Sequence, residues 1–232
     1  MNRAEANREF HRDLEGSAPG SIFSFLPAHG DSRAGAVAKH LSRALTEDLG
    51  VTVLLAGFDR RGYPLWRAAE SPRRLDGQTW GAFLCDEGGV PVLDAREVHP
   101  RQMRGVLDYA RAHYHIVCAD LSDANGAHAA EVLRASDGIF LVSGSDPASI
   151  EGIREKVEWL SSINLADRCA LLLRRTTNGA GAREMEELTD LPVCSLIETA
   201  EQLGQLATWL AADTVARTLQ PESPAENLAV AS

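Results

Sequence analysis

The sequence has no surplus of positive charge. Of its 232 residues, 23 are Lys or Arg and 33 are Asp or Glu, which gives a formal net charge of −10 and a pI of about 5.2. Binding to a nucleic-acid backbone depends on Lys and Arg side chains that neutralise phosphates. We therefore expect no nucleic-acid partner. One group of arginines stands out, and we interpret it as a solvated loop in preference to a binding patch: Arg60, Arg61, Arg67, Arg73 and Arg74.

Metal-binding and membrane signals are missing as well. The four cysteines form no Cys-x-x-Cys pair and the seven histidines form no His-Glu-x-x-His motif, so we expect neither a metal site nor a disulfide framework. Cys118 and Cys169 lie in apolar runs and are predicted to be core thiols. Segment 1–20 is charged and polar, unlike a signal peptide, and no apolar run reaches the roughly 18 residues of a membrane span. These absences favour a cytoplasmic protein.

What the sequence does contain is organised around the segment Ser21–Leu45. It predicts a buried strand at Ser21–Leu26, a glycine-containing turn at Pro27–Gly35, and then a helix with regularly spaced apolar residues. Strand, glycine turn and helix are the frame of a phosphate-binding loop, in which backbone N–H groups and a helix N-terminus hold phosphate oxygens. The usual chemistry is absent, because no Lys-Ser or Lys-Thr pair follows the glycines.

Apolar strands alternate with helical segments along the rest of the chain. Further strands are predicted at Val51–Ala56, Val90–Leu93, Tyr114–Leu121, Gly138–Val142, Cys169–Leu173 and Val193–Ile197. Helices are predicted at Arg101–Ala112, Ala127–Ala135, Pro147–Leu160, Arg183–Leu188 and Glu201–Leu219, and Ser71–Gly89 is the least regular region. This alternation predicts an α/β fold: a doubly wound, mostly parallel sheet with helices on both faces.

The predicted fold divides the chain and places its binding edge. We expect an N-terminal arm with a short helix over residues 1–20, one domain over residues 21–219, and a disordered tail over residues 220–232. Ligands of such sheets bind beyond the carboxyl ends of the strands. Pro27–Gly35, Gly57–Arg61 and Asp120–Asn125 are therefore predicted to lie on one rim.

Five landmarks follow one another along the chain. They are Glu9-Phe10-His11-Arg12 before the first strand, the strand–loop–helix itself, VLLAGFDRRGYPL from Val53, YHIVCADLSD from Tyr114, and the later pair Arg134–Asp146 and Glu187–Ile197. In this order they resemble the MinD/ParA class of P-loop ATPases. They are more closely similar to the cytoplasmic domain of CpsD-like bacterial tyrosine kinases of capsule and exopolysaccharide synthesis. The resemblance implies a three-layer, P-loop NTPase-like fold.

The resemblance also implies a role for individual positions. Aligning Val37-Ala38-x-x-Leu41 with the family's loop puts Arg33 in a glycine slot, Ala34 in the lysine slot, and Gly35 and Ala36 in the hydroxyl slots. A second register, Gly30 to Gly35, keeps the glycine spacing but offers Ala36 and Val37 for the reactive pair. Asp59 and Asp120 fill acidic slots, whereas Gly57 replaces the acid that orients water. Arg174 stands where the family has a base-reading Asn.

These replacements remove the groups that phosphoryl transfer needs. A loop lysine and a Mg²⁺ held by Ser/Thr and an acidic residue neutralise the phosphate oxygens in this class. The two lysines of the chain, Lys39 and Lys156, lie outside the loop. We therefore expect no cofactor and no efficient hydrolysis. ATP with Mg²⁺ would require an unconventional loop in which Arg33 or His29 supplies the missing charge.

Several residues keep two interpretations each. Asp120 either binds a metal or holds its own loop by accepting backbone N–H bonds, and Asp59 has the same two interpretations. Asp31, Ser32 and Arg33 either bind an anion through backbone amides or form a plain turn. Arg60 and Arg61 either meet an acidic partner or are solvated. By the resemblance, Glu9 and Arg12 belong to a helix used for self-association, although Glu15 replaces its last arginine.

Two functions remain in competition. The first is a catalytically inactive pseudo-ATPase that acts as a scaffold or regulatory subunit, held at the inner membrane through partners such as a related ATPase or a cellulose or exopolysaccharide synthase. It would form a homodimer or a hetero-assembly through the degenerate phosphate loop: Gly30, Asp31, Ser32, Arg33, Ala34, Gly35 and Ala36. The second is a switch that binds ATP, ADP or a cyclic dinucleotide without hydrolysis. A DNA-partitioning ATPase is disfavoured by the acidic charge.

Overall fold

The described part of the protein is built on one eight-stranded sheet. The structure is a computed structural model that describes residues 19–30, 33–58, 84–95, 98, 100–122, 127–176 and 179–219. The strands lie in the order β3-β4-β2-β5-β1-β6-β7-β8, and all neighbours are parallel except β3 and β4. Their bounds are β1 Ser21–Pro27, β2 Val53–Gly57, β3 Leu84–Glu87, β4 Val90–Asp94, β5 Ile116–Asp120, β6 Gly138–Ser143, β7 Cys169–Leu173 and β8 Val193–Leu196.

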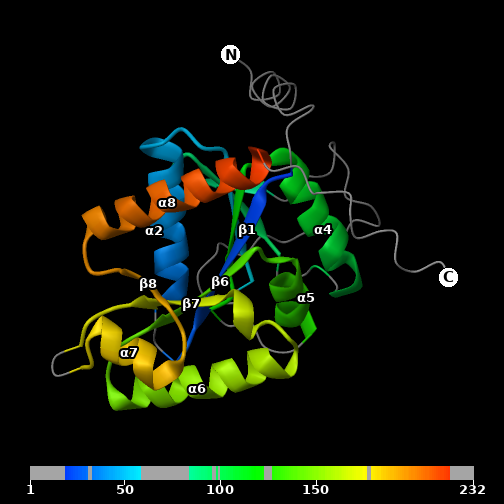
Figure 1. The fold of residues 1–232 in the computed structure, drawn as a ribbon. Coiled ribbons are helices and arrows are strands. Elements are labelled where there is room, and N and C mark those ends of the chain that lie inside the picture. The colour runs from blue at the N-terminus through cyan, green and yellow to red at the C-terminus, as the bar shows by residue number, and fades with distance from the viewer. Residues whose placement is uncertain are drawn as a thin grey trace.

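Helices cover both faces of this sheet (Figure 1). In the described residues they are α2 Ala34–Glu47, α4 Pro100–His113, α5 Ala127–Ala135, α6 Pro147–Ser162, α7 Ala182–Thr189 and α8 Ala200–Leu219, with a short 3-10 helix, η2, at Ala166–Arg168. One apolar core joins α2 and α8 to the sheet, and a second joins α4, α5, α6 and α7 to its other face. The predicted three-layer, doubly wound α/β fold is confirmed.

The central strands are buried on both faces, as their composition predicts. All five residues of β5 are buried, and in β1 the apolar side chains alternate between the two cores, with Phe23 and Phe25 on the α2 side and Ile22 and Leu26 on the other. Phe25 stacks on Phe140 of the neighbouring β6, with ring centroids 5.4 Å apart. Near-continuous apolar runs of this kind mark parallel strands covered by helices.

The hairpin of β3 and β4 was not expected from the sequence. β3 lies at the end of the region predicted to be least regular, and its residues are only partly buried. Gly88 and Gly89, both with positive φ, form the two-residue turn, and the Gly89 N–H donates to Asp86 Oδ1 at 3.1 Å. A Gly-Gly pair between two short strands is a hairpin signal. Residues 1–18 of the predicted arm 1–20 and the whole predicted tail 220–232 lie outside the described residues.

Hydrogen bonds beyond the strand ends fix the carboxyl edge of the sheet. The Ala28 N–H donates to Val142 O, the Leu121 N–H to Phe25 O, and the Phe58 N–H to Asp120 O, all at 3.0 Å. The described parts of the predicted rim, Pro27–Gly30, Gly57–Phe58 and Asp120–Ser122, are therefore held side by side. The start of α2 returns to the same edge.

We predict that Asp146 stabilises the fold as the N-cap of α6. Its carboxylate accepts hydrogen bonds from the Ser149 hydroxyl at 2.8 Å and the Ser149 N–H at 3.0 Å, and these bonds lower the pKa of Asp146. Asp146→Ala should reduce the free energy of unfolding by about 1 kcal/mol in urea titrations at pH 7. Because the folded pKa is lowered, this stabilisation is complete above the ordinary Asp pKa and is lost as the pH falls through the folded value.

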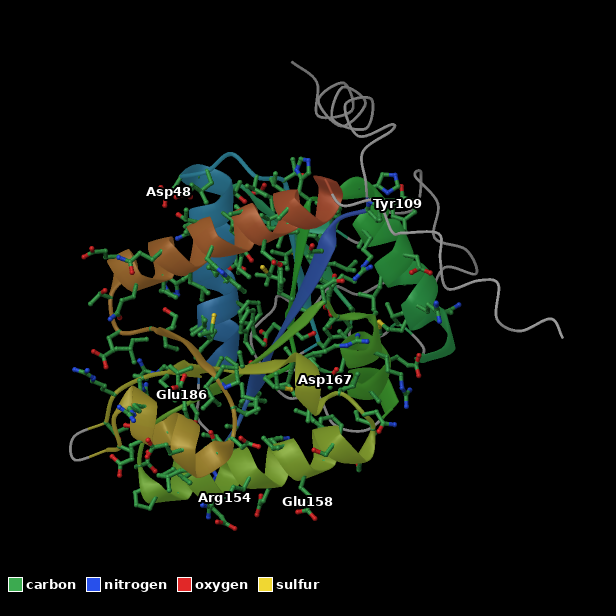
Figure 2. The ribbon with its side chains drawn as sticks, viewed as in Figure 1. Asp48, Tyr109, Arg154, Glu158, Asp167 and Glu186 are labelled. Carbon is green, nitrogen blue, oxygen red and sulfur yellow. The ribbon has the colours of Figure 1, made fainter. Side chains whose placement is uncertain are left out.

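The matched control for this cap is Glu158→Ala, on the same helix. Glu158 is exposed and points away from the sheet (Figure 2). An exposed substitution of this kind should change stability by less than about 0.5 kcal/mol. Equal losses in the two variants, or a loss at Asp146 that persists at low pH, would show that the cap does not act through its carboxylate.

Candidate functional site

The N-terminus of α2 faces the carboxyl edge of the sheet without a side-chain cap. Arg33 occupies the N-cap position with φ 57° and ψ 29°, makes no capping hydrogen bond, and is followed by no acidic residue in the first turn. The first N–H groups of a helix have no partner within it and carry partial positive charge. This end of α2 therefore has the features of an anion-binding helix terminus.

The carboxylate of Asp120 lies directly beside this terminus. Asp120 ends β5 and is 2 % exposed. A Cβ built on Gly35, in the first turn of α2, would lie 2.5 Å from Asp120 Oδ2 and 3.0 Å from the Ser122 hydroxyl oxygen. A side chain at position 35 would thus collide with the oxygens of Asp120 and Ser122. Glycine permits this close approach between α2 and the end of β5.

Ser122 holds the Asp120 carboxylate in place. Its N–H donates to Asp120 Oδ1 at 3.0 Å and its hydroxyl donates to the same oxygen at 2.5 Å. The sequence pattern predicts Asp120 as a site residue but indicates no role for Ser122. The only available signal was a serine two residues after a strand-ending aspartate, which is too common a pattern to indicate a site.

Gly57 lies between two carboxylates on the same edge. It is paired in register with Asp94 of β4 on one side and with Asp120 of β5 on the other. The alternation of core residues along these strands puts both aspartates on the α2 face of the sheet. Asp94 was not predicted as a site residue, although VPVLD ends in an aspartate in the same way as IVCAD.

The other predicted loop residues differ in where their side chains lie. Gly30 is exposed, and a Cβ built on it would meet nothing within 4 Å. Ala34 is 1 % exposed and packs in the core beneath α2, whereas Ala36 is exposed. The remaining predicted site and interface residues lie outside the described residues: Glu9, Arg12, Asp31, Ser32, Asp59, Arg60 and Arg61.

Neither lysine of the chain supplies the charge that the loop lacks. Lys39 extends from α2 to the β3–β4 hairpin, where its ammonium forms an ion pair with Glu87. Lys156 lies on α6, on the opposite face of the sheet, with its ammonium 5.6 Å from the centre of the Trp159 ring. In the described residues, Arg33 and His29 are exposed basic side chains near the start of α2 along the chain.

Three other kinds of feature bear on the described residues: a nucleophilic thiol, a metal cluster and a membrane-spanning helix. The thiols of Cys118 and Cys169 are buried, and burial raises the pKa of each to about 12, so neither is a nucleophile at neutral pH. Within the described ranges, no group of three or more His, Cys, Asp or Glu side chains could hold a metal ion by itself. No helix in that part of the chain is long and apolar enough to cross a bilayer.

Solved structures share this fold. The ParA family ATPase of Chlorobium tepidum TLS matches with a TM-score of 0.65 and 14% identity, over 87% of this chain and 94% of that one. MinD of Pyrococcus horikoshii OT3, complexed with Mg-ADP, matches with a TM-score of 0.65 and 15% identity, over 85% and 97%. Cobyrinic acid a,c-diamide synthase of Mycobacterium smegmatis, with a bound ATP analogue and magnesium, matches with a TM-score of 0.62 and 14% identity, over 86% of this chain and 98% of that one.

These likenesses establish the fold of MinD/ParA P-loop ATPases. MinD is matched as well in a MinC:MinD cell division complex from Aquifex aeolicus. No protein-family model and no curated protein matches the sequence. The expectation that no cofactor is involved was wrong, because proteins with this fold are solved with Mg-ADP and with an ATP analogue and magnesium. The expectation rested on the missing lysine and gave less weight to the backbone N–H groups at the start of α2.

The residues present fit a magnesium–phosphate group in their donor chemistry. Mg²⁺ prefers hard oxygen ligands, and the Asp120 carboxylate and the Ser122 hydroxyl lie together against Gly35. Phosphate oxygens prefer backbone N–H groups at a helix N-terminus, which α2 offers. The start of α2 and the end of β5 therefore offer oxygen ligands for magnesium and N–H donors for phosphate, even without a loop lysine.

We predict that restoring a side chain at position 35 destabilises the protein. Gly35→Ser places a Cβ 2.5 Å from Asp120 Oδ2, so the buried carboxylate must move and give up its bonds to Ser122. Overpacking of this kind costs about 1–3 kcal/mol, which urea unfolding would measure. Ala36→Ser, at the exposed neighbouring position, is the control and should cost less than about 0.5 kcal/mol. A Gly35→Ser variant as stable as the control would contradict the close contact.

Proposed function

We propose that the protein is a nucleotide-binding switch with the MinD/ParA fold, which binds an adenine nucleotide with magnesium, hydrolyses it poorly, and acts through protein partners. The observation that carries the proposal is the start of α2. There an uncapped helix terminus meets the buried Asp120 across Gly35, while both lysines are engaged elsewhere. On this proposal, the groups that bind phosphate and magnesium are present, and the groups that accelerate phosphoryl transfer are absent.

The binding half of the proposal rests on backbone and oxygen donors. We infer that phosphate oxygens are held by the N–H groups at the start of α2, from Arg33 to Ala36. Magnesium, when bound, would neutralise the charge of the phosphate oxygens. Among the described residues, Asp120 is well placed to hold it, because its carboxylate lies against the first turn of α2. The Mg-ADP of MinD and the ATP analogue of cobyrinic acid a,c-diamide synthase support this assignment by their shared fold.

The loss of turnover follows from two missing side chains. Ala34, in the slot that the sequence resemblance assigns to lysine, is buried in the core, so no ammonium stands at that position. Gly57, in the slot of a water-orienting acid, has no side chain between Asp94 and Asp120. Removing a single transition-state donor commonly costs 10²–10³-fold in rate. With both groups absent, hydrolysis would be slow enough for the bound nucleotide to act as a lasting signal.

The biological setting that we propose is an assembly with other proteins. A switch without turnover acts by changing what it binds, and MinD, which shares the fold, occurs in a complex with MinC. From the sequence resemblance alone, we infer a homodimer or a hetero-assembly with a related ATPase or a membrane polysaccharide synthase. Glu9, Arg12, Arg60 and Arg61 would contribute to the interface. The protein would be cytoplasmic and held at the inner membrane through these partners.

Calorimetry against ATP, ADP, a non-hydrolysable ATP analogue and a cyclic dinucleotide tests the proposal. We expect saturable binding of an adenine nucleotide that strengthens when Mg²⁺ is added. Phosphate release should be no more than roughly one-hundredth of that of an intact ATPase of the same fold assayed alongside. Absence of binding by every nucleotide would overturn the switch, and turnover equal to that of the intact ATPase would overturn the loss of catalysis.

A further prediction concerns Arg33. It is the one non-glycine residue with positive φ, among those the structure describes, that is neither Asn nor Asp. Backbone strain retained beside a binding site often accompanies function. If the guanidinium contacts phosphate, Arg33→Ala and Arg33→Gly should each weaken Mg-ADP binding about 10- to 100-fold, because a charged hydrogen bond contributes about 1.5–3 kcal/mol.

The two Arg33 variants should differ in stability. Arg33→Gly relieves the left-handed conformation and should be about 1 kcal/mol more stable than Arg33→Ala in urea. Arg134→Ala, at the other edge of the sheet, is the control and should leave Mg-ADP binding unchanged. Normal affinity in both Arg33 variants would exclude a phosphate contact by this residue.

A further inference from the structure

Ser122 supplies an oxygen close to the position where this class of site normally has one from the helix. A hydroxyl carried by residue 35 would extend from a Cβ that lies 3.0 Å from the Ser122 hydroxyl oxygen. Gly35 contributes no such oxygen. The Ser122 hydroxyl therefore lies close to the place of the missing group, although it comes from the end of β5 and not from α2.

We propose that Ser122 replaces the missing hydroxyl of the helix as a magnesium ligand, together with Asp120. This inference rests on the proposed function, because it assigns residues to the magnesium of a bound nucleotide. The Ser122 hydroxyl donates its proton to Asp120 Oδ1 at 2.5 Å, which turns the oxygen lone pairs away from that carboxylate oxygen. The second carboxylate oxygen, Oδ2, is the one that lies against Gly35. One hydroxyl oxygen and one carboxylate oxygen are thus presented at the start of α2.

Burial supports the pairing. Asp120 is 2 % exposed, and its Oδ1 is oriented by two bonds from Ser122. Ordered ligands of this kind bind a metal without first losing side-chain freedom. The exchange also accounts for Gly35, since a side chain there would occupy the space in which the Asp120 and Ser122 oxygens meet. In this proposal, the hydroxyl ligand comes from Ser122, after the end of β5, and not from α2.

The test measures how strongly nucleotide binding depends on magnesium. ADP affinity is determined by calorimetry in Mg²⁺ and in EDTA for the full-length protein, and the ratio of the two dissociation constants is the readout. In the wild type we expect Mg²⁺ to tighten binding at least tenfold. Ser122→Ala should bring this ratio close to one by weakening the affinity in Mg²⁺, since loss of a ligand or its orienting partner costs about 10–100-fold in metal affinity. Its affinity in EDTA should match that of the wild type.

Two further variants separate ligation from folding. Ser122→Thr keeps a hydroxyl and should retain the wild-type ratio. Ser145→Ala removes a hydroxyl at the end of β6, where Ser145 lies 3.2 Å from the Thr176 hydroxyl, and should also retain it. Mn²⁺ in place of Mg²⁺, observed by electron paramagnetic resonance with ADP present, should give a bound-metal signal that Ser122→Ala loses.

The outcomes distinguish this inference from the proposed function. If the wild type binds no nucleotide, the proposed function fails and the inference fails with it. If the wild type binds ADP with strong magnesium dependence and Ser122→Ala keeps that dependence, the function stands and Ser122 is not a ligand. If Ser122→Ala weakens binding equally in Mg²⁺ and in EDTA, Ser122 acts only by holding the loop, and the inference is wrong.

Discussion

The close contact between the start of α2 and the end of β5 is the constraint on which the site depends. The side chains of Asp120 and Ser122 lie so close to Gly35 that a Cβ there would collide with them, and Asp120 is almost completely buried in this contact. A buried carboxylate is costly unless it is hydrogen-bonded, and Ser122 provides two such bonds. The same contact thus fixes the chemistry of the edge and limits which residues it tolerates. It explains why alanine and glycine at this helix terminus are compatible with a well-packed fold.

The sheet keeps this contact in place from both sides. β5 is paired with β2 on one side and β1 on the other. Backbone hydrogen bonds continue at the carboxyl end of β5, from the Leu121 N–H to Phe25 O and from the Phe58 N–H to Asp120 O. The two apolar cores press α2 against one face and α4 and α5 against the other. The carboxyl edge therefore forms wherever this fold forms, whether or not the loop residues support catalysis. A fold shared at 14–15% identity with proteins solved with magnesium and a bound nucleotide accordingly does not determine turnover.

The charged groups around α2 fall into two sets. The ammonium of Lys39 is paired with Glu87 at the hairpin, and this pair ties α2 to β3. The positive end of α2 and the exposed Arg33 remain at the edge, opposite the carboxylates of Asp94 and Asp120. Backbone dipoles and one arginine favour an anion, and carboxylates favour a cation, so a magnesium–phosphate pair satisfies both better than either ion alone. This balance is the physical basis of the switch that we propose.

The sequence by itself determined the layers of the protein. The helix Ala127–Ala135 and the strand Cys169–Leu173 begin and end where apolar periodicity and flanking polar residues predict. The apolar pattern of each segment reflects which of its own side chains are buried. The partly buried β3 escaped prediction, since its stability comes from pairing with β4 and not from its own composition. Only the tertiary structure decided that Ser122 meets Gly35, that Lys39 reaches Glu87, and that Gly57 lies between Asp94 and Asp120. Each of these relations joins segments distant along the chain. The order and register of the strands and the packing of α2 on the sheet bring them together, and a one-dimensional pattern specifies none of these.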